Sequence, residues 1–210
     1  MKWRMMFGNL GIKTNRFVRH IALCMLLCFF FISATSFTLI SSYETKATSL
    51  TADNFGNFYS SSSNAIQKFS PDGKFICRYE EFKYGKIGSV DVSNPLKILV
   101  FFPDFMTVIM LDNFLSPIGS YKFFDFGYQN IQAVCASTDG RVWFYDNTDF
   151  KLKKINETGT IFLESQQLNL LLGTTPNPDF MLERDNKVYM NDSAIGILVF
   201  DIFGSYAKTI

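Results

Sequence analysis

Short apolar runs separated by turn residues recur through residues 49–210. The clearest copy spans residues 130–165. It contains an apolar run (IQAVCA), an Asp-Gly turn, an aromatic run (RVWFY), a polar loop, a run ending in INETG and a last short apolar run. Short β-branched and aromatic runs bounded by Asp, Asn and Gly are typical of strands joined by tight turns. This copy therefore predicts four strands in about 35 residues.

Three further copies align with this one and define a period. The third predicted strand of each copy ends at an equivalent apolar residue, and these residues are 42, 44 and 45 positions apart: Phe69, Leu111, Ile155 and Phe200. Four strands in 40–45 residues are typical of a β-propeller blade. We therefore predict an all-β, β-propeller-like fold with about four four-stranded blades, as an incomplete ring or an open arc.

The alignment also places the individual strands. The first strands are predicted at 48–52, 89–93, 131–137 and 178–183, and the second at 57–59, 98–100, 142–144 and 188–190. The third are predicted at 65–69, 108–111, 152–155 and 197–200, and the fourth at 75–79, 118–121, 161–163 and 206–210. Continuous apolar runs such as KILVFF at 97–102 suit sheets that neighbouring blades cover on both faces.

The first 36 residues have a different composition. A basic leader precedes an uncharged run at 21–32 (IALCMLLCFFFI) and the small residues Ser33 to Ser36. This layout indicates a secretory signal peptide over residues 1–36. The alternative is an uncleaved anchor, because the uncharged stretch extends to Ile40 and is long enough to span a bilayer. Residues 37–48 are expected to form a linker and the start of the first strand, and 49–210 the partial propeller domain.

Charge separates along the same boundary. The chain has 20 Lys and Arg residues and 19 Asp and Glu residues, of which six basic and one acidic precede residue 49. The remainder holds 14 basic and 18 acidic residues, for a net charge of −4. A mildly acidic domain argues against nucleic acid as a partner. Membrane contact is expected only through the N-terminal segment if it stays uncleaved.

Two cysteines, Cys77 and Cys135, lie beyond the leader. An exported protein meets an oxidising compartment, where a disulfide between them is one alternative. The two residues fall in non-equivalent strands of different repeats, which favours free thiols that pack as small apolar side chains.

Four runs in the domain carry a resemblance to a known family: 89–105 (SVDVSNPLKILVFFPDF), 111–116 (LDNFLS), 181–192 (MLERDNKVYMND) and 196–210 (GILVFDIFGSYAKTI). They resemble the uncharacterised six-bladed, NHL/TolB-like propeller proteins exported by Bacteroidota, over roughly residues 48–210. The resemblance implies an envelope or extracellular propeller whose relatives have two further blades. It favours a truncated product over a true four-bladed ring, and it assigns no catalytic residue.

Catalytic and metal-binding motifs do not appear in the predicted domain. The only histidine is His20, in the leader, which excludes His-dependent triads and histidine-metal sites from residues 49–210. The sequence also contains no CxxC pair, P-loop, GxGxxG or GxSxG motif. We predict no catalytic residue, no metal ligand and no cofactor.

The candidate ligand-binding residues come from the loops between second and third strands, which in a propeller lie on the same face as the blade-to-blade connectors. These loops combine carboxylates with aromatic rings: Phe102, Asp104, Phe105, Tyr145, Asp146, Asp149, Phe150 and Asp192. One hypothesis is a face that binds a glycan or a protein. The other is ordinary Asn and Asp turn chemistry.

These patterns favour a non-enzymatic exported propeller, a binding or scaffold module in the periplasm, at the cell surface or secreted. Its expected partner is an unidentified protein or glycan. Two alternatives stay open. One is a lactonase-like or lyase-like propeller enzyme whose metal site is incomplete in this chain, and the other is a subunit of an envelope assembly.

Overall fold

The structure is a computed structural model that describes Ser42 and residues 47–210. All of these residues belong to one compact unit, Ser41–Ile210. The predicted signal peptide or anchor, with most of the predicted linker, lies outside the described residues. Within the described part of the chain, no helix is long and apolar enough to cross a bilayer.

In the described part of the chain, sixteen strands form four antiparallel four-stranded sheets, and in every sheet the strands lie in chain order. Blade 1 contains β1 (Ser49–Ala52), β2 (Phe58–Ser61), β3 (Ala65–Phe69) and β4 (Phe75–Glu80). Blade 2 contains β5 (Ser89–Asp91), β6 (Ile98–Phe102), β7 (Thr107–Leu111) and β8 (Pro117–Lys122). Blade 3 contains β9 (Ile131–Ala136), β10 (Val142–Asp146), β11 (Lys151–Ile155) and β12 (Ile161–Glu164). Blade 4 contains β13 (Phe180–Arg184), β14 (Lys187–Asp192), β15 (Gly196–Asp201) and β16 (Tyr206–Thr209).

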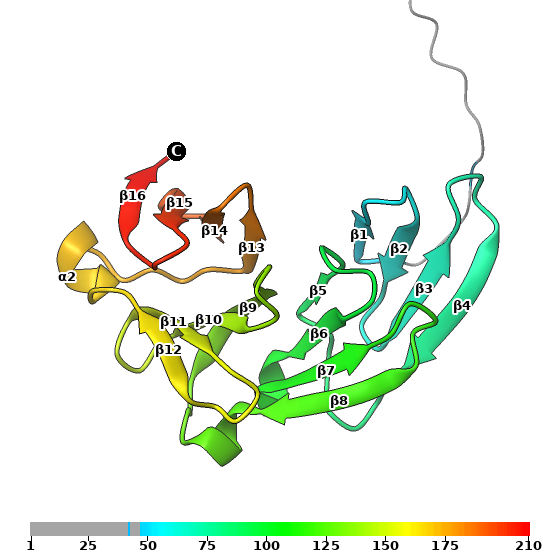
Figure 1. Cartoon of the computed structure of the whole chain (residues 1–210), viewed down its shortest axis with the longest axis horizontal. Coiled ribbons are helices and arrows are strands. Elements are labelled where there is room, and N and C mark those ends of the chain that lie inside the picture. The colour runs from blue at the N-terminus through cyan, green and yellow to red at the C-terminus, as the bar shows by residue number, and fades with distance from the viewer. Residues whose placement is uncertain (1–41, 43–46) are drawn as a thin grey trace, which may run out of the picture. The chain divides into compact units, whose positions relative to one another are not determined.

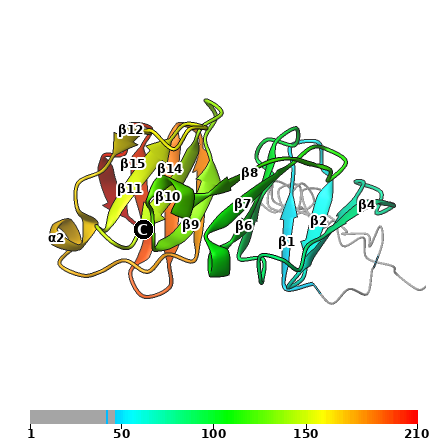
Figure 2. The same ribbon diagram turned by 90° about the horizontal axis from the view of Figure 1, so that it is seen from below.

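This arrangement confirms the predicted all-β propeller of four four-stranded blades, which follow one another in chain order (Figure 1). The observed strand ends differ from the predicted ones by at most two residues. Within residues 47–210, three short helices were not predicted: η1 (Pro103–Phe105), η2 (Phe123–Phe126) and α2 (Leu168–Leu172). Each is too short to produce a helical period in the sequence, and α2 lies at the outer side of blades 3 and 4 (Figures 1 and 2).

An aspartate turn recurs between strands. Asp112 Oδ1 accepts hydrogen bonds from the backbone N–H groups of Phe114 and Ser116, both at 2.8 Å. Equivalent bonds join Asp201 to the N–H groups of Phe203 and Ser205 at 2.9 and 2.8 Å. Because the side chain replaces backbone partners, the turn closes tightly and leaves the central phenylalanine exposed. Phe114 is 66% exposed and Phe203 is 65% exposed.

The core consists of three clusters of buried side chains, each shared by two neighbouring blades. The first joins blades 1 and 2 and includes Tyr59 and Val100. The second joins blades 2 and 3, with Phe101 and Phe144, and the third joins blades 3 and 4, with Trp143. No cluster of described residues joins blade 4 to blade 1. The outward face of each of these two blades is therefore uncovered by a neighbouring blade within the described chain.

The two cysteines of the domain are free thiols, as predicted. Cys77 packs at the edge of the cluster between blades 1 and 2, and Cys135 is fully buried in the cluster between blades 3 and 4. Burial raises the pKa of the Cys135 thiol well above its usual value, which keeps it protonated and unreactive.

Candidate functional site

The loops between second and third strands meet the connectors that lead to the next blade, as predicted. The N–H group of Ile87 donates to the carbonyl of Ser63 at 2.7 Å in blade 1. The N–H group of Leu168 donates to the carbonyl of Phe150 at 2.8 Å in blade 3. These bonds bring the loops and the connectors together on one face of the blades, which we call the loop face.

The aromatic candidates on the loop face are divided by burial. Phe102 and Tyr145 are fully buried between blades. Phe150 is half-buried and packs against the cluster between blades 3 and 4. Only Phe105 is exposed, at 57% of its surface. Three of the four rings thus contribute to packing, and Phe105 is the ring that is open to a ligand.

Asp146 and Asp149 surround a buried lysine. Lys153 Nζ lies 2.8 Å from Asp146 Oδ2 and 2.6 Å from Asp149 Oδ2, and 5.3 Å from the centre of the Tyr128 ring. Burial by itself lowers the pKa of Lys153. The hydrogen bonds and charges of the two aspartates outweigh burial, so the pKa is raised. Lys153 therefore stays charged and fills the place where a cationic ligand would bind.

The two remaining candidates, Asp192 and Asp104, each accept hydrogen bonds from the blade connectors. Asp192 accepts from the N–H group of Asn177 at 2.6 Å, and from Ala194 and Ile195 in its own loop. Burial raises the pKa of Asp192, but these three donors outweigh it and the pKa lies below its usual value. Asp104 is exposed and accepts from the N–H group of Lys86 at 3.2 Å. A ligand-binding role for the eight candidate residues stays a prediction.

Two further buried carboxylates connect the innermost strands of adjacent blades. Asp91 of β5 accepts from the N–H group of Ala136 at 2.8 Å. On the other side, Glu183 of β13 accepts from the N–H group of Thr138, the Ser137 hydroxyl and Trp143 Nε1. The end of β9 and the turn after it are therefore bonded by a carboxylate from blade 2 and another from blade 4.

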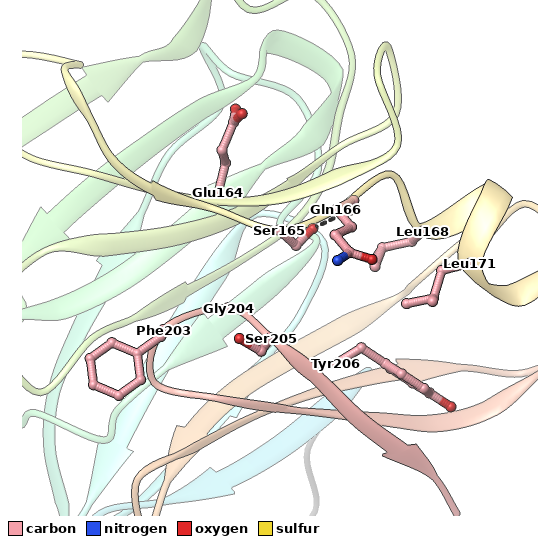
Figure 3. Close-up of a pocket in the computed structure, with 9 residues that line it drawn as sticks. All are labelled: Glu164, Ser165, Gln166, Leu168, Leu171, Phe203, Gly204, Ser205 and Tyr206. Carbon is pink, nitrogen blue, oxygen red and sulfur yellow. Dashed lines mark hydrogen bonds between the residues drawn. The ribbon is translucent and has the colours of Figure 1, made fainter.

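A groove lies between the outer strands of blades 3 and 4, and we call it the β12–α2 groove (Figure 3). It has a volume of about 220 Å³ and is formed by the end of β12, by α2 and by the turn from β15 to β16. Its lining comprises Glu164, Ser165, Gln166, Leu168, Leu171, Phe203, Gly204, Ser205 and Tyr206.

Local hydrogen bonds fix the two walls of this groove. On one wall, Ser165 Oγ accepts from the N–H group of Leu152 at 2.9 Å and donates to the carbonyl of Gln166 at 2.7 Å. Leu168 is fully buried and anchors α2 to the core. The other wall is the aspartate turn at Asp201. Both walls are thereby held in place before any ligand arrives, which lowers the entropic cost of binding.

The floor of the groove rests on the core. Gly204 has a φ of 83°, and a Cβ atom at this position would lie 3.6 Å from Cη2 of Trp143. In Figure 3 the Gln166 side chain extends toward the β15–β16 turn, whereas Glu164 points away from it. Glu164 forms an ion pair with Lys151 at 2.7 Å. The groove therefore presents an amide, hydroxyl groups and apolar side chains to a ligand.

These groups are suited to recognition. Phe203 and Leu171 are exposed at 65% and 45% of their surfaces. An apolar surface with a few neutral hydrogen-bonding groups is typical of sites that bind peptides or glycans. Among the described residues, no group of three or more His, Cys, Asp and Glu side chains is placed to hold a metal ion.

No protein-family model and no curated protein matches the chain. Solved structures do match: a catalytically inactive variant of virginiamycin B lyase from Staphylococcus aureus with quinupristin has 17% identity and a TM-score of 0.56. The matched region covers 77% of this chain and 54% of the lyase chain. A protein of unknown function from Bacteroides caccae has 10% identity and a TM-score of 0.55, and the match covers 78% of this chain and 60% of that protein. The WD40 propeller domain of Doa1 has 14% identity and a TM-score of 0.57, and the match covers 81% of this chain and 55% of that domain.

These similarities concern the fold, and with the four sheets described above they define the chain as a β-propeller. The chain spans between half and three fifths of the length of these three proteins.

The β12–α2 groove was missed at the sequence level. Its walls come from a connector and from a turn on the opposite side of the blade, and no motif joins the two segments. The only available signal was the repeated Asp-x-Phe pattern, seen at Asp53, Asp112 and Asp201. That pattern places an exposed phenylalanine in each turn but does not show which one borders a hollow.

Proposed function

We propose that the chain is an exported, non-enzymatic β-propeller that acts as a binding and scaffold module in the bacterial envelope. It recognises a protein or a glycan through the β12–α2 groove, and the exposed pair Asp104 and Phe105 offers a second contact on the loop face. The rigid walls of the groove, its exposed apolar side chains and its amide and hydroxyl groups support this proposal.

One observation carries the non-enzymatic part of the proposal: every buried carboxylate of the described residues is already hydrogen-bonded within the fold. These residues are Asp53, Asp91, Asp146, Glu183 and Asp192. A general acid at neutral pH needs a raised pKa. The pKa values of Asp53, Glu183 and Asp192 are instead lowered by their hydrogen bonds, despite burial. Asp53, Glu183 and Asp192 are therefore ionised acceptors that hold turns and blades together.

The alternative is a lyase-like or lactonase-like enzyme. A lyase is among the fold neighbours, and the S. aureus enzyme is catalytically inactive in a variant in which a histidine is replaced by alanine. Residues 42–210 of this chain contain no histidine. These residues therefore supply no histidine for such a role, and the enzyme alternative would need residues beyond them.

Export is proposed from the N-terminal sequence. The basic leader, the apolar run and the small residues before position 37 have the layout of a signal peptide. The resemblance to exported six-bladed propellers points to the same compartment.

The groove is tested by a single substitution. Labelled exported protein is applied to arrays of bacterial envelope glycans and peptides. Phe203→Ser is expected to lower binding about tenfold or more, because it removes the largest exposed apolar side chain of the groove. Phe114→Ser is the matched control, because Phe114 has the same position in an aspartate turn and the same exposure.

Equal binding by both variants would show that the groove is not the recognition surface. Turnover of an array ligand by the wild-type protein would favour the enzyme alternative.

A further inference from the structure

Each blade has two different faces. The leading face points toward the next blade and the trailing face toward the preceding one. Tyr59, Leu99 and Trp143 hold equivalent positions on the leading faces of blades 1, 2 and 3, and the following blade buries all three. On the trailing faces, Val90, Val134 and Met181 hold equivalent positions and are also buried.

Blade 4 leaves a leading face uncovered. Tyr189 holds the position of Trp143 and is only half-buried. Ile197 holds the position of the fully buried Leu152 and is 38% exposed, and Phe180 is 43% exposed. A shallow hollow on this face is lined by Asp179, Phe180, Leu182, Tyr189, Asn191 and Ile197. The face therefore has the composition of a blade interface without the neighbouring blade.

Blade 1 leaves a trailing face uncovered. Leu50 holds the position of Val90, Val134 and Met181, but it is 69% exposed. Beside it lies a hollow of about 270 Å³, lined by Ala47, Ser60, Ser61, Ser62, Ala65, Gln67 and Arg78. Among the described residues, one face of each type is thus left without a neighbouring blade.

The sizes of the side chains on these two faces are complementary. At the interface of blades 3 and 4, the small Ala133 on the leading face and the large Met190 on the trailing face belong to one cluster. On the two uncovered faces the large side chain lies on the leading face and the small one on the trailing face. Phe180 of blade 4 takes the position of Ala133, and Ser60 of blade 1 takes the position of Met190. Phe180 is 43% exposed on the blade 4 face, and Ser60 lines the hollow on the blade 1 face.

We propose that the leading face of blade 4 docks on the trailing face of blade 1 of a second copy of this chain, in a head-to-tail contact. The two faces differ, so the contact is heterologous and either closes a ring or extends into a chain of copies. Polar residues on both faces, Asn191 on one and Gln67 on the other, make the contact less apolar than the internal interfaces. A reversible association is therefore expected. The proposal goes beyond the groove function and holds whether or not the groove binds a ligand.

The contact is tested by sedimentation of the exported protein from about 1 to about 100 μM, a range suited to a small interface. The wild-type protein is expected to form dimers or larger species as the concentration rises. Phe180→Asp on blade 4 and Leu50→Asp on blade 1 are each expected to weaken self-association at least tenfold. Leu96→Asp is the control, because Leu96 is 68% exposed but lies in the turn between β5 and β6.

Mixing the two variants distinguishes a head-to-tail contact from any other. Copies with Leu50→Asp keep an intact blade 4 face, and copies with Phe180→Asp keep an intact blade 1 face. The mixture is therefore expected to form one-to-one dimers, which neither variant forms alone. A wild-type monomer at every concentration would overturn the proposal. So would normal association of Leu50→Asp copies, which would indicate a contact between two blade 4 faces. Unchanged circular dichroism spectra would establish that each variant is folded.

Discussion

Replacing Glu183 with alanine is expected to lower the free energy of unfolding by about 3–5 kcal/mol. The carboxylate is buried between blades 3 and 4. It accepts hydrogen bonds from Trp143 Nε1 at 2.6 Å, the Ser137 hydroxyl at 2.7 Å and the Thr138 N–H group at 2.9 Å. Alanine would leave these donors without their acceptor and a cavity beside Trp143. Chemical denaturation measures the change. Glu164→Ala is the control, with an expected loss of about 0–1 kcal/mol because its ion pair is exposed.

Glu183 also makes stability depend on pH. Burial raises its pKa, but its hydrogen bonds outweigh burial and the folded-state pKa lies below the reference value of 4.5. A lowered folded-state pKa contributes stability above the unfolded-state pKa, and this contribution is lost as the pH falls through the folded-state value. Wild-type stability should therefore decline below about pH 4.5 more steeply than that of Glu183→Gln. Identical acid profiles would contradict an ionised Glu183.

Lys153→Ala is the second substitution with a large expected effect, a loss of about 3–5 kcal/mol. Lys153 is buried and neutralises Asp146, which is also buried, at 2.8 Å. Removing the lysine leaves an uncompensated negative charge inside blade 3. The double variant Lys153→Met with Asp146→Asn is expected to recover much of the loss, because no buried charge then lacks its partner.

Lys151 provides the matched control on the same strand. It pairs with Glu164 at 2.7 Å, and the Glu164 side chain is 44% exposed. Lys151→Ala is expected to cost about 0–1 kcal/mol. Equal losses for Lys151→Ala and Lys153→Ala would contradict the assignment of the Asp146–Lys153 pair to the core.

The sequence predicted the blades well because the repeat is carried by local patterns. Aspartate and glycine turns and the apolar third strands recur at a nearly constant period, so even the least regular strand was placed within two residues. The predicted free thiols were also confirmed, since Cys77 and Cys135 belong to different interfaces.

The site was harder to predict because side-chain partners are set by packing. The sequence predicts Asp146 and Asp149 to be acids on a loop that is open to a ligand, yet both bind Lys153 from the next strand. In the sequence, Lys153 belongs to a run with Lys151 and Lys154 that suggests a charged, exposed strand. Neighbouring blades bury two of these lysines, and a single sequence shows neither that burial nor the β12–α2 groove.

The proposed recognition role is tested most directly by photo-crosslinking in the bacteria that produce the protein. A photoreactive residue at position 203 would lie at the rim of the β12–α2 groove, and one at position 114 would lie in the equivalent turn of blade 2. The proposal predicts a discrete adduct with an envelope protein or glycan from position 203 and none from position 114. The same adducts from both positions, or none from position 203, would contradict it.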